Sequence, residues 1–125
     1  MHGEITKGRS TISSSKLYDL VGTEINLGDL CDDGSQMRPH IVWFGEPVPM
    51  MEKAIDIVQE SDYLIIIGTS LMVYPASGLI DYARVNVKKF YIDPDAKSNL
   101  NRNDIELISM RASKGVKSLV KRLME

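Results

Sequence analysis

The stretch from Tyr63 to Ala76, Y-L-I-I-I-G-T-S-L-M-V-Y-P-A, limits the possible folds of this chain more than any other stretch. Residues 63–67 form a short, nearly all-apolar run rich in isoleucine, and Gly68 ends it. Runs of this kind are typical of strands that are buried on both faces of a parallel sheet. We therefore expect residues 63–67 to form a central strand.

Two hydroxyl residues follow Gly68 at the carboxyl end of this expected strand. Gly68, Thr69 and Ser70 combine a permissive backbone with two hydroxyl groups, at the place where open α/β sheets bind their ligands. A phosphate or a ribose would fit there. A tight turn from strand to helix, in which the hydroxyls cap backbone groups, explains the same tripeptide equally well. The tripeptide alone does not decide between a ligand site and a turn.

From His40 onward the sequence alternates between strand-like runs and helical periods. The expected strands are residues 41–44, 63–67, 90–92 and 105–110, and the expected helices are residues 49–60, 76–87 and the segment from 113 onward. In the last helix, Ser113 is the expected N-cap and the positions expected to face the core are Val116, Leu119, Val120 and Leu123. This order predicts the α/β class, with a Rossmann-like, mostly parallel sheet and helices on both faces.

The segment before this alternation differs in composition. Residues 1–37 are rich in Gly, Ser, Thr, Asp and Asn and show little sustained periodicity, so we expect them to be mostly loop. We therefore divide the chain into a loop-rich part, 1–38, and an α/β part, 39–125. A structureless stretch this long indicates either a functional loop or missing chain that packs against it.

Charge and composition limit the classes of partner. The formal net charge is -2 and the isoelectric point is near 5.7, which disfavours charge-driven binding of nucleic acid. No run approaches the roughly 18 apolar residues that a membrane-spanning helix needs. The N-terminus lacks the apolar core of a secretory signal, and the single Cys31 cannot form an internal disulfide. We therefore expect a cytoplasmic protein that binds neither nucleic acid nor membrane.

Three segments occur in a recognisable order and spacing. They are R-P-H-I-V-W-F-G-E at residues 38–46, I-I-G-T-S-L-M-V-Y-P-A at residues 66–76 and I-D-P-D at residues 92–95. Together they resemble the sirtuin family of NAD-dependent protein deacylases. The resemblance runs from His2 to the last helix, but it covers only the second half of the family's catalytic domain. The glycine-rich Gly-Ala-Gly-x-Ser loop and the Gln-Asn-x-Asp segment of the family's first half do not occur in this sequence.

The resemblance implies a role for the His2-Gly3 pair. It matches the family's His-Gly pair, whose histidine acts as general base on a ribose hydroxyl of the cofactor NAD. An imidazole that titrates near neutral pH suits this chemistry. The implied reaction is attack by an acyl-lysine carbonyl oxygen on C1′ of the nicotinamide ribose, nicotinamide release, and acyl transfer to ADP-ribose. A solvated histidine beside the first Met remains the alternative for the isolated chain.

The resemblance also implies a site for an acyl-lysine peptide. An extended peptide adds its backbone to the segment 42–46 and to the loop that carries Val73. The carbonyl of Val42 accepts a hydrogen bond from the acyl-lysine Nε, and Phe44 and Val73 line the slot for the lysine stem. Gly45 and Glu46 complete the match. The alternative is that residues 41–44 are only a core strand, although alternate residues of one strand can serve both roles.

The contact with the adenosine side of NAD is the third implied site. Asp93 stands where the family usually has Asn, and Asp95 where it often has Glu, so carboxylates would accept from ribose hydroxyls. A small residue just before the last helix resembles the segment against which the adenine ring packs. The implied NAD-binding residues are Gly68, Thr69, Ser70, Asp93, Asp95 and Ala112.

Many sirtuins hold a structural zinc ion on two cysteine pairs, in the region that here runs from about Thr6 to Met37. A closed site of that kind needs four ligands. Cys31 is the only cysteine in the chain, so we expect no metal site.

These observations favour an NAD-dependent protein lysine deacetylase or deacylase, of which this chain is an inactive fragment. The alternative class is a non-catalytic NAD-binding, FAD-binding or interaction module of the same fold, because fold does not fix function. Such a module has no need of the F-G-E segment or the His-Gly pair. The sequence does not separate a truncated enzyme from a split enzyme that recovers a separate N-terminal half as its partner.

Overall fold

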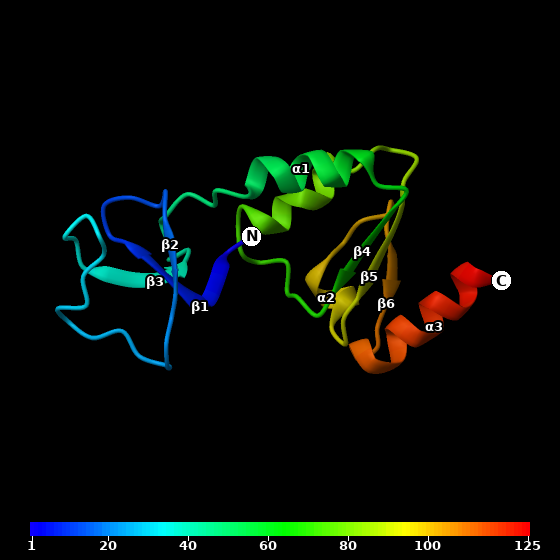
Figure 1. The fold of residues 1–125 in the computed structure, drawn as a ribbon. Coiled ribbons are helices and arrows are strands. Elements are labelled where there is room, and N and C mark those ends of the chain that lie inside the picture. Colours follow the sequence, from blue (N-terminus) through cyan, green and yellow to red (C-terminus); the bar gives the residue numbers. More distant parts are fainter. The chain divides into compact units, whose positions relative to one another are not determined.

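In the part of the chain that the structure describes, the strands form two three-stranded sheets (Figure 1). The structure is a computed structural model that describes residues 1–98 and 100–125 in full and residue 99 by its backbone. Contacts divide the chain into two compact units, Met1–Met50 and Met51–Glu125, and each carries one of the sheets.

The sheet of the first unit is antiparallel. Its strands are β1 (Gly3–Ser10), β2 (Leu17–Asp19) and β3 (Met37–Ile41), and β1 lies between the other two. The prediction of mostly loop for residues 1–37 missed both β1 and β2. The sequence of β1, G-E-I-T-K-G-R-S, is too polar to predict a strand. Its partner β3 lies about 30 residues further along the chain, so no local pattern shows the pairing.

The segment after β3 also differs from prediction. The apolar run at residues 41–44 does not form a strand of the parallel sheet, because Ile41 ends β3 and pairs with β1. Residues 43–46 instead form a turn, closed by a hydrogen bond from the Glu46 amide to the Trp43 carbonyl oxygen at 3.1 Å. The β-prone composition of this run therefore reflects the pairing of Ile41 with β1 inside the first unit.

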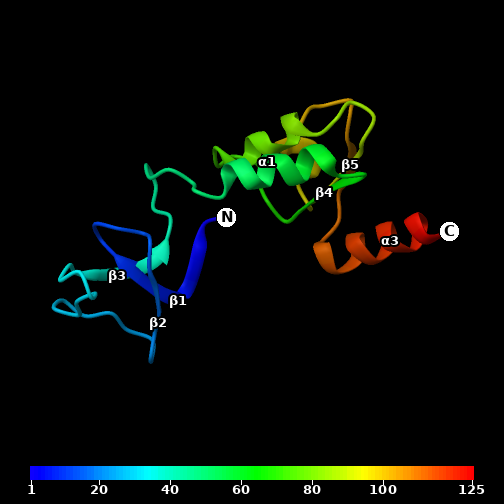
Figure 2. The same ribbon diagram turned by 45° about the horizontal axis from the view of Figure 1, so that its top comes forward.

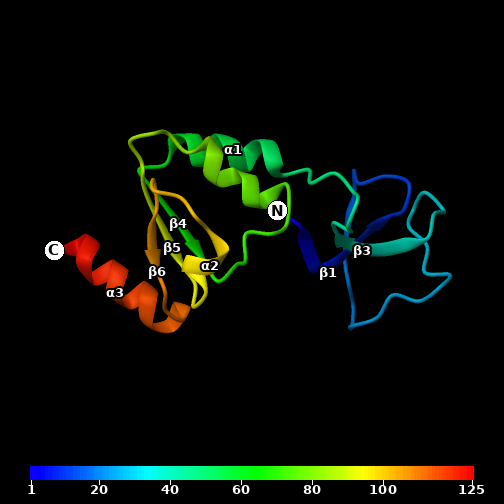
Figure 3. The ribbon, with the colours of Figure 1, turned by 180° about the vertical axis from the view of Figure 1, so that it is seen from behind.

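The second unit has the predicted α/β architecture, a parallel sheet with flanking helices. Its strands are β4 (Tyr63–Ile67), β5 (Lys88–Ile92) and β6 (Glu106–Ile108), with β5 in the middle (Figure 3). Its helices are α1 (Met51–Glu60), the 3-10 helix η1 (Ala76–Tyr82), α2 (Ala96–Asn99) and α3 (Ala112–Met124). Among the described helices, none is long and apolar enough to cross a membrane.

The middle strand of the parallel sheet is packed on both faces, and α1 and α3 lie on opposite sides of the sheet (Figure 2). On one face Tyr91 of β5 packs with residues of η1 and α2, in a cluster made of Ile80, Tyr91, Ala96 and Ile105. On the other face Phe90 and Ile92 pack against Leu119 of α3. Gly115 allows this close approach of α3, because a Cβ there would lie 2.4 Å from Cγ2 of Ile92.

The central position in this sheet belongs to β5, and the prediction that β4 is central was wrong for the described chain. No described strand pairs with the outer edge of β4. Leu64 and Ile66 pack into the core, but Tyr63, Ile65 and Ile67 on the opposite face remain 47%, 40% and 43% exposed. An all-apolar run signals two covered faces, and here one of them is open.

Two helices also differ in detail from their predicted form. The helix expected over residues 76–87 is a shorter 3-10 helix, in which the Gly78 amide bonds to the carbonyl of Pro75, three residues back. Helix α3 begins one residue before Ser113, its N-cap is Arg111 and has no side-chain cap bond, and Val120 is exposed instead of facing the core.

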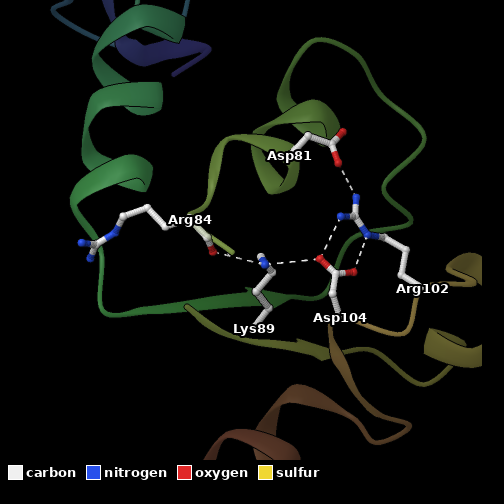
Figure 4. A network of polar contacts seen from close by, with 5 residues as sticks. All are labelled: Asp81, Arg84, Lys89, Arg102 and Asp104. Carbon is white, nitrogen blue, oxygen red and sulfur yellow. Dashed lines mark hydrogen bonds and ion pairs between the residues drawn. The ribbon is translucent and has the colours of Figure 1, made fainter. Parts of the chain in front are cut away.

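A network of ion pairs links η1, β5 and the segment before β6 (Figure 4). Lys89 is only 5% exposed, and its Nζ lies 3.3 Å from Oδ2 of Asp104. Arg102 binds the same carboxylate through Nε at 2.8 Å and also pairs with Asp81 of η1. The hydrogen bonds from Arg102 hold the pKa of Asp104 well below its usual range. The buried lysine therefore keeps an ionised partner.

Candidate functional site

Strand pairing in the first unit places His2 beside Val42. The Val42 amide donates to the His2 carbonyl oxygen at 2.9 Å, and the next residue, Gly3, pairs with Ile41. Gly3 has φ +100°, and a Cβ at this position would lie 2.0 Å from the carbonyl oxygen of His40. The glycine after His2 is thus required by close backbone approach. Two predicted functional residues, 40 positions apart in the sequence, become neighbours.

The turn that follows Val42 presents an aromatic ring. Phe44 is 94% exposed, and Gly45 has φ +88°, a conformation that favours glycine. Val42 itself is half-buried. A large apolar ring held in solvent on a fixed turn is available to an apolar ligand group.

The Glu46 side chain is directed inward, to the protein's own cations. Arg38 donates two hydrogen bonds to its carboxylate, one of them from Nη2 at 3.1 Å. The Trp43 amide donates to Oε2 at 3.0 Å, and Arg9 lies 3.5 Å from the same oxygen. These contacts, led by that with Arg38, lower the pKa of Glu46 to about 2. The carboxylate of Glu46 therefore stabilises the turn.

A cavity of about 260 Å³ in the first unit is lined by Gly3, Val42, Arg9 and His40 among others. Nδ1 of His40 is buried there without a described hydrogen-bond partner. The hollow lies beside the strand segment that carries the predicted peptide-binding residue Val42. Its lining combines the cationic side chain of Arg9 with the apolar residues Ile41 and Val42 at the end of β3.

In the second unit, Gly68, Thr69 and Ser70 lie at the carboxyl end of β4 and are all exposed. The Gly68 amide donates to the Ile92 carbonyl oxygen at 3.0 Å, and the space around its Cα is open. Oγ1 of Thr69 accepts from the Leu71 amide at 3.1 Å. The cap expected from a simple turn is therefore present at Thr69, while the backbone at Gly68 remains accessible.

The carboxyl ends of β5 and β6 bring further predicted residues to this edge of the sheet. Asp93 follows β5 directly, its amide bonds to the Ile108 carbonyl oxygen at 3.2 Å, and its Oδ1 accepts from the Asp95 amide at 2.9 Å. Asp95 and Ala112 are exposed, and Ala112 opens α3 just after β6. Because parallel strands end at one edge, these residues and Gly68 belong to the same end of the sheet.

Val73 lies in the loop before η1, where its carbonyl oxygen accepts from the Ser77 amide at 3.0 Å and its side chain is half exposed. It belongs to the second unit, whereas Val42 and Phe44 belong to the first. The structure describes the two units separately, so a common slot lined by Phe44 and Val73 stays a prediction.

Arg9 and Arg38 were missed from the sequence. The signal was present in part, since Arg38 opens the segment R-P-H-I-V-W-F-G-E and Glu46 closes it. Opposite charges at the two ends of a short apolar run indicate a pair that closes a turn. Arg9 has no such local signal, because β1 brings it to Glu46 from 37 positions away.

Among the residues that the structure describes, no group of three or more His, Cys, Asp or Glu side chains could hold a metal ion. Cys31 is buried in the loop between β2 and β3, and burial raises the pKa of its thiol.

Comparison with known proteins identifies the family. The model of the Sir2 family matches residues 1–75. The NAD-dependent protein deacylase of Helicobacter pylori (strain ATCC 700392 / 26695) is 42% identical over 125 residues, which are 100% of this chain and 54% of that protein. The NAD-dependent protein deacylase of Bacteroides thetaiotaomicron is 40% identical over 124 residues, 95% of this chain and 53% of that protein.

Solved structures agree with these relatives. The crystal structure of a Sir2 homolog–NAD complex superposes with a TM-score of 0.76 at 28% identity, covering 98% of this chain and 49% of that chain. The structure of Sir2Tm bound to a propionylated peptide gives 0.69 at 25% identity, covering 98% and 54%. The chain thus spans about half the length of the relatives that it matches. It belongs to the Sir2 family.

Proposed function

We propose that the complete protein is an NAD-dependent protein lysine deacylase and that this chain supplies the second half of its catalytic domain. The observation that carries the proposal is the pairing of His2 with Val42, which brings the proposed base next to the proposed acceptor of the acyl-lysine. The relatives named NAD-dependent protein deacylase, and the neighbours solved with NAD and with a propionylated peptide, support it.

The predicted site residues of the first unit have proposed roles in the reaction of an acyl-lysine peptide. The Val42 carbonyl accepts from the acyl-lysine Nε, the exposed ring of Phe44 covers the lysine stem, and the backbone at Gly45 and Glu46 pairs with the peptide. Val73 of the second unit contributes an apolar side chain to the same stem. His2 takes a proton from a ribose hydroxyl as general base, the role that histidine side chains have most often in acid–base catalysis.

The end of the parallel sheet is the proposed contact for the adenosine part of NAD. Bound NAD supplies an electrophilic ribose carbon at which nicotinamide is displaced. The open space at Gly68 admits a ligand to the backbone, and the exposed hydroxyls and carboxylates fit ribose oxygens. The residues proposed to hold it are Gly68, Thr69, Ser70, Asp93, Asp95 and Ala112.

A polypeptide that corresponds to the relatives' first half is the proposed partner, either as part of the same protein or as a separate chain. The open edge of β4 and its exposed apolar face are suited to receive a further strand. A cytoplasmic location and a small domain without zinc are also proposed, both supported by the single cysteine of the sequence.

Release of nicotinamide from an acetyl-lysine peptide tests the function. We expect no turnover by the lone chain, NAD-dependent turnover when the complementary half is added, and loss of turnover with His2→Tyr in that mixture while NAD binding is kept. Orientation of reactants contributes on the order of 7–11 kcal/mol to lowering a barrier, so half a site should not suffice. Robust turnover by the lone chain or by the His2→Tyr mixture would overturn the assignment. Binding of NAD without any turnover by the assembled pair would favour the non-catalytic module.

A further inference from the structure

Three groups hold the turn at residues 43–46 by binding the carboxylate of Glu46. They are the Trp43 amide and the side chains of Arg38 and Arg9. Glu46 closes the turn twice, because its amide donates to the Trp43 carbonyl at 3.1 Å and its carboxylate accepts from the Trp43 amide at 3.0 Å. Two arginines then fix the carboxylate from outside the turn, and their side chains are largely buried, with 19% of Arg38 and 16% of Arg9 exposed.

Arg38 connects this turn to the strand that precedes it. Its Nη2 donates both to Oε2 of Glu46 at 3.1 Å and to the carbonyl oxygen of Ile41, the residue before Val42, at 3.2 Å. Its guanidinium also lies 5.9 Å from the centre of the Trp43 ring. One planar, five-donor group therefore fixes both sides of Val42, which a lysine ammonium cannot reproduce.

Arg9 connects the same carboxylate to β1. This strand begins at Gly3, next to His2, and pairs with β3 near both of its ends, with an irregular register between Glu4 and Gly8. The Glu46 carboxylate is thus the common partner of the strand that leads to the proposed base and of the segment that carries the proposed peptide acceptor.

We propose that Arg38 and Arg9 are positioning residues, which hold the 43–46 turn in its peptide-accepting shape through Glu46. This inference rests on the proposed function. It assigns the side chain and the amide of Glu46 to the turn, and leaves the Glu46 carbonyl oxygen and the exposed Phe44 ring to the peptide. A turn ordered before the substrate arrives avoids the entropy cost of ordering it on binding.

The variant Arg38→Lys tests this role in the protein assembled with the complementary half. We expect KM for an acetyl-lysine peptide to rise about tenfold, the effect of losing one charge-assisted hydrogen bond, while kcat and KM for NAD change little. Arg122→Lys is the matched control, because Arg122 also pairs with a glutamate, Glu106, and lies 5.6 Å from the centre of an aromatic ring, but in the second unit.

Amide hydrogen exchange on the lone chain gives a readout that does not need activity. Arg38→Lys should speed exchange of the Trp43 amide and leave the melting temperature within the range of the Arg122→Lys variant. The inference would be overturned if the wild-type assembly is active and the Arg38→Lys and Arg122→Lys variants have equal KM values for the peptide. A wild-type assembly that releases no nicotinamide would overturn the proposed function, and the peptide role of the arginines with it.

Discussion

Gly3 shows how a missing side chain determines the place of a neighbouring functional group. Its backbone lies so close to His40 that no Cβ fits, and its φ of +100° is one that other residues rarely adopt. The consequence is that β1 can start directly against β3, with the His2 carbonyl bonded to Val42. The catalytic role proposed for His2 therefore depends on the residue after it.

Substituting Gly3→Ala should separate the start of β1 from β3. We expect faster hydrogen exchange of the Val42 amide and loss of turnover in the assembled protein, since His2 loses its register. Gly28→Ala is the control, because Gly28 has a similar φ of +98° but no atom within 4 Å of the added Cβ. Equal protection of the Val42 amide in the two variants would contradict this account.

At the scale of secondary-structure elements, α3 lies against the sheet only because Gly115 is small. An added Cβ would lie 2.4 Å from the Ile92 side chain, which is fully buried in the middle strand. Neither residue lies in the proposed catalytic machinery. The packing of α3 on β5 can therefore be tested by stability alone.

Gly115→Ala should lower the stability of the second unit. Overpacking of a core costs about 1–3 kcal/mol, and the better helix propensity of alanine returns only about 1 kcal/mol. We expect a net loss of about 1 kcal/mol, measured by urea denaturation followed by circular dichroism. Ser118→Ala, at an exposed position of the same helix, should not destabilise. A Gly115→Ala variant more stable than the wild type would disprove the close packing.

Elements with strong local signals were predictable, and those defined by distant pairing were not. The helical periodicity of residues 51–58 predicted α1, and the apolar runs predicted β4 and β5. The polar β1 left no local signal, because its strand character comes from β3. In the candidate site, the segment around Phe44 could be located, but the inward turn of Glu46 depends on Arg9, which no local pattern connects to it.

At the scale of the whole molecule, β4 is an edge strand of the parallel sheet in the described chain, and one of its faces is apolar and partly exposed. Edge strands of soluble proteins are commonly protected by charge, bulges or a covering segment. The described part of β4 has three large side chains partly exposed on one face, Tyr63, Ile65 and Ile67. The chain spans about half of its relatives' length, and the proposed complementary half is the segment that we propose to cover this face.

The lone chain should therefore self-associate at high concentration. Ile65→Lys should reduce this association, because a charge on the exposed face of β4 opposes pairing between copies. Ile57→Lys is the control, since Ile57 is more exposed, at 61%, but lies on α1. Sedimentation velocity and hydrophobic-dye binding provide the measurement. A wild-type chain that stays monomeric and binds no dye would contradict the open-edge interpretation.

The buried position of Lys89 has a chemical consequence for the second unit. Lys88 and Lys89 are adjacent in β5, but Lys88 points to solvent whereas Lys89 is enclosed with Asp104. An amine-acylating reagent can reach Lys88 in the folded chain, and it can reach Lys89 only when the buried ion pair with Asp104 opens. The two neighbouring lysines thus form an internal label pair, in which the ratio of modification reports how often this unit opens.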